Sequence, residues 1–479
     1  MKRGLAALQS QITLAFGDVR FWILLFFILR LYNIWLPPLD MAHNWRQTTV
    51  AMVARNFYEI EANPFYPRID IAGDLSGITG MEFPLLNYLI YLVSLVFGYD
   101  HWYGRLINLT FSSLGIWFFY LLIKKYFNQR TALYASVVLL ASIWFAYSRK
   151  IMPDTFSTSL IITGLYFGTN YLDRRPSVAN LITFFFLVLL GTLSKLPAAC
   201  LLGAILPLLL SHQVNRQRRI NLIMASILAM IPVAFWYFYW VPHLVEEFGF
   251  WHFFMGKELI TGGREIIIFW NESLKNFYDN ALKFIGFAAF LLGLFFAFYK
   301  KNKKMLGIFA FVSLPYLLIV LKAGQTFAFH SYYIIPFVPV MALLAGYGLT
   351  QIKRKGLSRW LLLAIVVEGL ANQQHDFRLK EKDLPILELE QVLDRFSHQE
   401  DLIAINSGYY PTPMYFAHRR GWVAPNDDLL SEAYRNNLKK HGLSYIVILK
   451  KSFGTAIHLP EKRIFDNENF SIYQTVPVK

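Results

Sequence analysis

Eleven apolar stretches, each close to the length needed to cross a bilayer, constrain this sequence more than any other feature. A transmembrane helix needs about 20 mostly apolar residues, within a range of about 17–25. Hydrophobic residues make up 56% of the chain and charged residues only 16%, against about 25% in soluble proteins. We therefore predict an α-helical polytopic membrane protein with about 11–13 transmembrane helices. The predicted spans are 20–37, 104–123, 131–148, 155–172, 178–194, 196–211, 219–240, 281–298, 305–322, 332–351 and 358–372.

Basic clusters predict the orientation of these spans. Short cytoplasmic loops are enriched in Lys and Arg, and with eleven spans every cluster falls on the cytoplasmic side. The protein is then expected in the inner (plasma) membrane, with its N-terminus on the cytoplasmic side. The apolar stretch 84–97 is short for a span and is expected to lie on the outer face as an interfacial helix. The clusters are Lys2-Arg3, Lys124-Lys125 with Arg130, Arg174-Arg175, Arg216 to Arg219, Lys300 to Lys304 and Lys353 to Lys355.

The net charge of +15 belongs to the hydrophobic part of the chain. Residues 373–479 hold 14 basic and 14 acidic residues, so the whole excess lies in residues 1–372, beside the predicted spans. Nucleic-acid binding, which a basic and aromatic-rich chain would otherwise suggest, is therefore not expected. The single cysteine, Cys200, excludes an intramolecular disulfide framework and a cysteine-based zinc site.

Two domains are predicted. Residues 1–372 form the transmembrane domain, with long outer loops at 38–83 and 240–280, and residues 373–479 form a small extracytoplasmic α/β domain. Within the first outer loop, a helix over 44–61 is expected to lie on the membrane surface. The tail shows a helical pattern at 384–396 and strand-like runs at 401–406 and 444–449.

Two acids, a histidine and an arginine of the first outer loop are candidates for catalysis and for binding an anionic substrate. Asp40, His43 and Arg46 precede or begin the expected surface helix, and Glu82 precedes the interfacial helix. A carboxylate, an imidazole and a guanidinium together suit general-base chemistry on a substrate with an anionic group. The alternatives are interfacial anchoring for the first three residues and a helix-start carboxylate for Glu82.

Basic residues on the outer side break the positive-inside trend and need a local reason. Arg149, Lys150 and Asp154 lie in one outer turn, and Lys195 lies in another. A charge near membrane depth is costly unless it is paired or hydrated, and a phosphate is a natural counter-ion for the three cations. The alternatives are snorkelling to lipid headgroups and helix capping by Asp154.

A late outer motif adds His330 and Tyr333 at the start of a predicted span. Alone, these residues are typical of an aromatic belt. Taken with the other outer motifs, they favour a polyprenyl phosphate sugar as substrate, with its phosphate held by cationic and hydroxyl donors. The alternative is a transporter or flippase for a lipid-linked or anionic substrate. Transporters often bind near the bilayer midplane on repeated, broken helices, and no such repeat is evident.

The ordered set of motifs resembles the GT-C membrane glycosyltransferases of family 39. The motifs are Ala54 to Phe57, Glu82 to Tyr88, Arg149 with Met152 to Asp154, Ser194 to Pro197, and His330 to Tyr333 with Pro336. The resemblance covers roughly residues 20–350. It implies an inverting sugar transfer from a polyprenyl (undecaprenyl) phosphate donor to a hydroxyl or phosphate on a lipid, glycan or protein acceptor.

The resemblance also implies roles for particular residues. Lys195, His330 and Tyr333 would contact the donor phosphate, and Glu82 would be a substrate-site or metal-site acid. Many relatives have an Asp-Glu pair where this chain has Arg46-Gln47, so the base is assigned to Asp40, with His43 second. No cofactor is required, but a divalent metal held by Glu82, His243 and His252 is an alternative that the resemblance leaves open.

Overall fold

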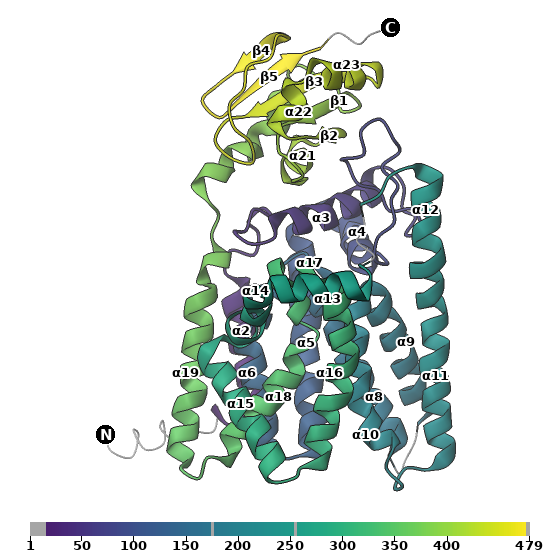
Figure 1. Cartoon of the computed structure of the whole chain (residues 1–479), viewed down its shortest axis with the longest axis vertical. Coiled ribbons are helices and arrows are strands. Elements are labelled where there is room, and N and C mark those ends of the chain that lie inside the picture. Colours follow the sequence, from purple (N-terminus) through teal and green to yellow (C-terminus); the bar gives the residue numbers. More distant parts are fainter. Residues whose placement is uncertain (1–15, 174–176, 253–255, 476–479) are drawn as a thin grey trace. The chain divides into compact units, whose positions relative to one another are not determined.

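The computed structural model (Figure 1) describes residues 16–173, 177–252 and 256–475. These residues form two compact units whose segments alternate along the chain. The first, here the helical unit, comprises 16–34, 105–236 and 256–374. The second, here the mixed unit, comprises 35–104, 237–252 and 375–475. The last segment of the mixed unit begins at residue 375, and the first outer loop and residues 237–252 group with it, while the predicted division at 372/373 stays a prediction.

Each predicted span coincides with helical structure. Asx residues cap several of these helices: Asp18, Asn128, Asn215 and Asn302 accept hydrogen bonds from backbone N–H groups in the first turns of α2, α6, α11 and α16. The helices are α2 (Val19–Leu31), α5 (Trp102–Tyr126), α6 (Gln129–Ala141), α7 (Trp144–Tyr147), α8 (Pro153–Leu172), α9 (Val178–Ser194), α10 (Leu206–Leu209), α11 (Arg216–Phe235), α13 (Leu259–Ile268), α14 (Trp270–Lys275), α15 (Lys283–Tyr299), α16 (Lys303–Ala323), α17 (Gln325–Phe329), α18 (Val338–Gln351) and α19 (Lys355–Gln373). Among them lie the 3₁₀-helices η1 (Leu196–Ile205) and η4 (Ser331–Ile334) and the π-helices η2 (Trp236–Trp240) and η3 (Asn276–Ala281).

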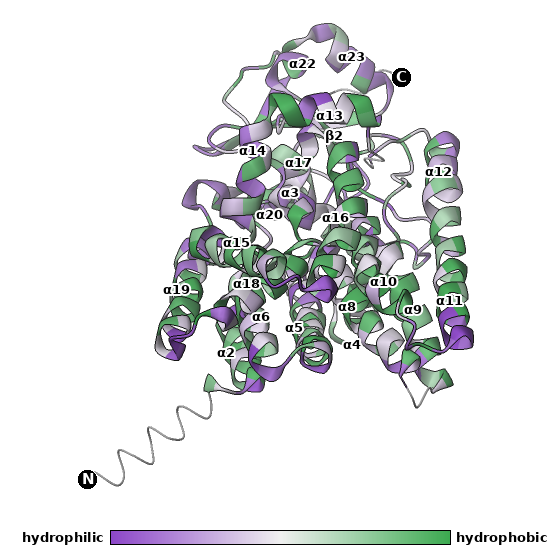
Figure 2. Cartoon of the chain, turned by 60° about the horizontal axis from the view of Figure 1, so that its bottom comes forward, coloured by the Kyte–Doolittle hydropathy of each residue, from purple (hydrophilic) through white to green (hydrophobic). Residues whose placement is uncertain are grey.

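Fewer helices than predicted are long and apolar enough to span a bilayer unbroken. Among the described residues three helices meet that test, Trp102–Tyr126, Arg216–Phe248 and Lys303–Ala323, or up to four if the pair Trp270–Ala281 and Lys283–Tyr299, bent by 94°, is one span. The apolar helices Val178–Ser194, Leu196–Leu209 and Val338–Gln351, which coincide with three further predicted spans, are shorter, within 10–17 residues. The helix that starts at Arg216 runs to Phe248, eight residues into the predicted outer loop. Figure 2 shows its hydrophilic start and the hydrophobic length that follows.

Small residues bring the central helices of the helical unit together. A Cβ atom added to Gly293 of α15 would lie 1.8 Å from the backbone oxygen of Leu344 in α18. A Cβ atom added to Gly346 of α18 would lie 2.4 Å from the backbone nitrogen of Ala135 in α6. Such contacts are typical of packing between membrane helices, where small residues let backbones approach.

The mixed unit contains a five-stranded sheet in the order β2-β1-β3-β5-β4. Strand β1 pairs in parallel with β2 and β3, and β5 pairs antiparallel with β3 and β4. The strands are β1 (Leu402–Ile405), β2 (Gly421–Val423), β3 (Leu443–Leu449), β4 (Lys462–Asp466) and β5 (Phe470–Gln474), and the helices are α3 (Asn44–Glu59), α4 (Leu85–Phe97), α12 (Val241–Phe248), α20 (Leu389–Leu393), α21 (Thr412–Ala417), α22 (Asn426–Leu430) and α23 (Glu432–Lys440), with the 3₁₀-helices η5 (Gln374–Phe377) and η6 (Glu381–Glu388).

Helix α3, which the sequence predicted as a helix over 44–61 on the membrane surface, is buried over most of its length. Every residue from Arg46 to Phe57 is buried, and Met52 and Phe57 share one apolar core with Ile405 and Val447 of the sheet. The predicted strands 401–406 and 444–449 are confirmed as β1 and β3. The predicted helix 384–396 is a 3₁₀-helix followed by the short α20. The basic clusters Lys2-Arg3 and Arg174-Arg175 lie outside the described residues.

Candidate functional site

A buried asparagine of α5 organises the first basic turn of the helical unit. Its side-chain amide nitrogen, Asn108 Nδ2, donates to the backbone oxygens of Tyr147, Lys150 and Met152 at 3.1, 2.8 and 3.2 Å. Its Oδ1 accepts from Thr155 Oγ1 at 3.0 Å. One amide therefore fixes the backbone that carries Arg149 and Lys150, and both side chains are buried.

The second basic motif follows the end of α9. Ser157 Oγ of α8 donates to the backbone oxygens of Gly191 and Lys195, at 2.6 and 3.3 Å, which fixes the point where α9 gives way to η1. Lys195 Nζ lies 3.9 Å from Asp154 Oδ1 and 5.7 Å from the ring centre of Tyr332. The outer turn, the lysine and the late aromatic motif therefore meet in one place.

The late motif also contacts the first turn. Tyr147 OH and Ser331 Oγ are 2.8 Å apart, and Lys150 Nζ lies 5.5 Å from the Tyr147 ring centre. We call this assembly the cationic cluster: Tyr147, Lys150, Asp154, Lys195, Ser331 and Tyr332.

Three predicted residues border the cationic cluster. The ring of His330 lies 5.6 Å from that of Tyr332, and its Nδ1 is 3.0 Å from the Thr326 backbone oxygen. Tyr333 stacks on Tyr332 with ring centres 5.0 Å apart. Arg149, the residue before Lys150, donates through Nη2 to the backbone oxygen of Asn33 at 3.0 Å.

Sequence reasoning selected Lys150, Asp154 and Lys195 but missed Tyr147, Ser331 and Tyr332. Ser331 and Tyr332 lie inside the motif His330 to Tyr333, and Tyr147 lies two residues before Arg149. They contribute two phenol groups and a hydroxyl among two ammonium groups and one carboxylate. Ammonium and hydroxyl groups are suitable donors to a phosphate. The arrangement can therefore bind an anion that also has an apolar or sugar portion stacking on tyrosine rings.

The predicted acids of the first outer loop are each engaged by a polar partner in the mixed unit. Arg46 Nη2 pairs with Glu82 Oε1, and Gln47 Nε2 donates to Asp40 Oδ2 at 3.0 Å. Asp40 is 4% exposed and Glu82 2% exposed. Arg46 and Gln47 occupy the positions where the family resemblance leads one to expect acids, and each holds a carboxylate supplied from elsewhere in the unit.

His252 lies within electrostatic reach of the Arg46–Glu82 pair. Burial and the Arg46 guanidinium lower the pKa of His252 to about 4, while Glu82 acts in the opposite direction. The imidazole is therefore neutral at neutral pH. His43 begins α3 in a left-handed conformation, with φ of 59°, and its backbone oxygen accepts from the amides of Arg46 and Gln47, both at 3.2 Å.

Glu82, His243 and His252, the metal ligands that the resemblance suggested as an alternative, do not lie together as a ligand set. His243 instead lies against aromatic rings, with centres 6.0 Å from Tyr239 and 5.3 Å from Trp240. Within residues 16–173, 177–252 and 256–475, no group of three or more His, Cys, Asp or Glu side chains is placed to hold a metal ion. Glu82, His243 and His252 thus do not form a ligand set in this structure.

Comparison with known proteins gives matches at the levels of family and fold. Residues 82–239 match the family model of dolichyl-phosphate-mannose-protein mannosyltransferases. The chain superposes on ArnT from Cupriavidus metallidurans bound to undecaprenyl phosphate with a TM-score of 0.60 and 13% identity, covering 95% of this chain and 98% of that one. It superposes on the Archaeoglobus fulgidus oligosaccharyltransferase complexed with Zn and sulfate with a TM-score of 0.52 and 13% identity, covering 90% and 68%. No curated protein sequence matches.

The chain is a membrane glycosyltransferase of the GT-C fold. The segment of this glycosyltransferase that matches the family model includes Glu82, Arg149, Lys150, Asp154 and Lys195. The predicted fold class, an α-helical GT-C protein with a small C-terminal α/β domain, is confirmed.

Proposed function

We propose that this glycosyltransferase transfers a sugar from a polyprenyl phosphate donor to a hydroxyl or phosphate acceptor on the outer face of the inner membrane, with inversion at the anomeric carbon. The observation that carries the proposal is the cationic cluster, in which residues from three separate outer motifs surround one place. The ArnT structure that shares this fold contains undecaprenyl phosphate, which supports the same class of donor here.

The cationic cluster is assigned to the leaving group. During transfer the bond between the anomeric carbon and the phosphate oxygen breaks, and that oxygen keeps the electron pair. The Lys150 and Lys195 ammonium groups stabilise the added negative charge, and their burial strengthens this effect relative to water. Asp154, 3.9 Å from Lys195, orients that lysine before the donor binds.

Asp40 is assigned as the base, with His43 second. Its carboxylate accepts the proton of an acceptor hydroxyl as the hydroxyl oxygen attacks the anomeric carbon from the face opposite the phosphate. The Gln47 side chain donates to one carboxylate oxygen at 3.0 Å, which orients the carboxylate for this step. A phosphate acceptor would already be ionised and would need no base. Glu82, paired with Arg46, is assigned to substrate positioning.

The proposal is tested by transfer assays with the purified enzyme in vesicles that contain a polyprenyl phosphate sugar. Asp40→Asn should lower the transfer rate by about 10²–10⁴-fold, as expected for loss of a general base. Lys195→Ala should lower it by about 10²–10³-fold. Lys355→Ala, which removes an exposed lysine at the start of α19, serves as the control and should leave the rate unchanged. Full activity in both site variants would refute the proposal.

The sugar and the acceptor are to be identified in cells. Mass spectrometry of lipid-linked sugars and surface glycans in a deletion strain should show one donor that accumulates and one glycan substituent that disappears. A flippase would instead be favoured if an intact lipid-linked substrate accumulated in the cytoplasmic leaflet of the deletion strain while extracts of that strain still transferred the sugar in vitro.

A further inference from the structure

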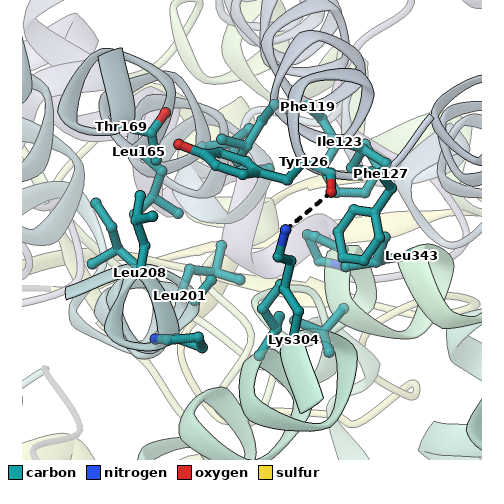
Figure 3. A pocket seen from close by; sticks show the side chains of 18 of the residues that line it. Phe119, Ile123, Tyr126, Phe127, Leu165, Thr169, Leu201, Leu208, Lys304 and Leu343 are labelled. Atoms are coloured by element: carbon teal, nitrogen blue, oxygen red, sulfur yellow. Dashed lines mark hydrogen bonds between the residues drawn. The ribbon is translucent and has the colours of Figure 1, made fainter. Parts of the chain in front are cut away.

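A cavity of about 470 Å³ lies in the helical unit and has no part in the proposed reaction. Its walls come from the last turns of α5, the second half of α8, η1 with α10, the first turn of α16 and the start of α18. Figure 3 shows apolar side chains from these elements surrounding one space. Cavities that bind small molecules or lipid chains usually measure about 300–1,000 Å³.

The cavity is separate from the cationic cluster. Helix α8 carries Asp154 in its first turn, whereas Ile162, Leu165 and Thr169, eight to fifteen residues later, line the cavity. At about 1.5 Å per residue, the lining residues of α8 lie about 12–22 Å from Asp154 along the helix. The first turn of α16 contributes Lys303 and Lys304 to the lining, so the cavity reaches the end of the helical unit that carries the basic loop 300–304.

The chemistry of the lining changes from inside to mouth. Phe119, Leu165, Leu201 and Leu343 make the interior apolar (Figure 3). Lys303 and Lys304 have exposed side chains, and among the described lining residues they carry all the formal charge.

Local contacts hold one of these lysines at the mouth. Lys304 Nζ donates to the backbone oxygen of Tyr126 at 3.3 Å, the dashed line of Figure 3. The same ammonium lies 5.5 Å from the ring centre of Tyr126 and 5.8 Å from that of Phe127. An ammonium held over aromatic rings in this way keeps its remaining donor positions for an anion.

We propose that this cavity binds one acyl chain of an anionic phospholipid from the leaflet beside the basic loops, with the headgroup phosphate held by Lys303 and Lys304. The apolar walls match the acyl chain, and basic pockets between membrane helices on the cytoplasmic side are known to bind anionic headgroups. A soluble anion would leave the apolar walls unfilled. A zwitterionic lipid would fill them but carries a positive charge close to the two lysines.

The test uses the full-length enzyme in nanodiscs of phosphatidylcholine, titrated with phosphatidylglycerol and followed by native mass spectrometry. Wild-type protein should retain one phosphatidylglycerol molecule. The double variant K303A/K304A should weaken this binding roughly 30-fold, because each basic residue near an anionic headgroup contributes about 1 kcal/mol. Ala204→Phe, which places a ring in the lining, should also abolish retention.

The control variant K353A/K355A removes two positive charges at the start of α19 and just before it, and neither lysine lines the cavity. It should bind phosphatidylglycerol as the wild type does. Equal retention of phosphatidylcholine, equal weakening in the control, or retention by Ala204→Phe would overturn the proposal. Displacement of phosphatidylglycerol by a polyprenyl phosphate would do so as well, because the cavity would then be part of the donor site.

Discussion

At the scale of single residues, His418 of the mixed unit lies between two carboxylates. Its Nε2 is 2.9 Å from Glu59 Oε2 and its Nδ1 is 2.5 Å from Glu390 Oε1. Burial lowers the pKa of His418, but the hydrogen bonds to Glu390 and Glu59 outweigh burial and the nearby Arg55 charge, so the pKa is raised overall. The contact joins α3 to residues more than 300 positions later in the chain.

The raised pKa predicts a pH-dependent stability of the mixed unit. A histidine whose folded pKa exceeds its unfolded value of about 6.5 stabilises the protein fully below that value. The contribution is lost as the pH rises through the folded pKa. The unfolding temperature of the enzyme should therefore fall as the pH is raised above about 6.5. The change should correspond to about 1 kcal/mol or less, because the carboxylates are partly exposed.

Two variants isolate this effect in thermal unfolding scans. His418→Asn fits the left-handed backbone at this position, where φ is 49°, and should lower stability below pH 6.5 while flattening the pH dependence. His441→Asn removes a more exposed contact with Asp74 and should keep the wild-type slope. An unchanged slope in His418→Asn would show that another group is responsible.

Residue-level prediction from the sequence worked best for charges in unusual places. Lys150 and Lys195 were selected because positive charge is rare on the outer side of a membrane, and the structure brings both into one cluster. The pairing of Arg46 with Glu82 could not be predicted, because the two residues are 36 positions apart. Side-chain identity and spacing do not specify a contact that depends on how the intervening loop folds.

At the scale of elements, α15 and α18 pack with little space between their backbones. Gly293→Ala would place a methyl group 1.8 Å from the backbone oxygen of Leu344 and 2.5 Å from its carbonyl carbon. Backbone atoms cannot turn away as a side chain can, so the helices must separate. We expect a loss of about 1–3 kcal/mol and a lower thermal midpoint in detergent.

Gly356→Ala in α19 provides the matched control for this experiment. A Cβ atom there meets nothing within 4 Å, and alanine is the better helix former by about 0.8–1 kcal/mol. Its thermal midpoint should equal or exceed that of the wild type. Equal midpoints for the two variants would mean that α15 and α18 tolerate separation.

Interruptions of the helices were harder to predict from the sequence than the helices themselves. The hydropathy pattern predicted one continuous span over 131–148, yet the helix is interrupted between α6 and α7. There, Ser142 Oγ donates to the Leu139 backbone oxygen at 2.6 Å and accepts from the Trp144 amide at 3.2 Å. A serine whose side chain bonds to nearby backbone groups competes with the helical hydrogen bonds. The mean hydropathy of the segment does not reveal this competition.

At the scale of the whole molecule, the mixed unit is built from segments that are distant in sequence. Phe57 of α3 is 3% exposed and belongs to the same core as Ile405, Val447 and Ile472 of the sheet. Composition suggested that the tail is a separate domain because it is more polar than the spans. Composition does not show that the tail needs apolar side chains from the first outer loop to complete its core.

A substitution in the first outer loop should therefore loosen the C-terminal sheet. Phe57→Ala removes a buried ring and should cost about 3–5 kcal/mol, with faster hydrogen exchange at the amides of β3. Tyr58→Ala, at an adjacent position that is 41% exposed, should leave exchange in β3 unchanged. Faster exchange confined to α3 in the Phe57 variant would contradict a shared core.

The alternation of segments has a consequence for biosynthesis. The first long segment of the mixed unit ends at residue 104 and its last segment begins at residue 375, so 270 residues (105–374) separate the two. At about 5–20 residues per second of translation, the first segment waits roughly 15–55 s before the partners of its buried face emerge. During that interval lipid or the insertion machinery must cover the apolar surface of α3 and its neighbours. Assembly of this enzyme is therefore expected to depend on the order in which its segments are synthesised.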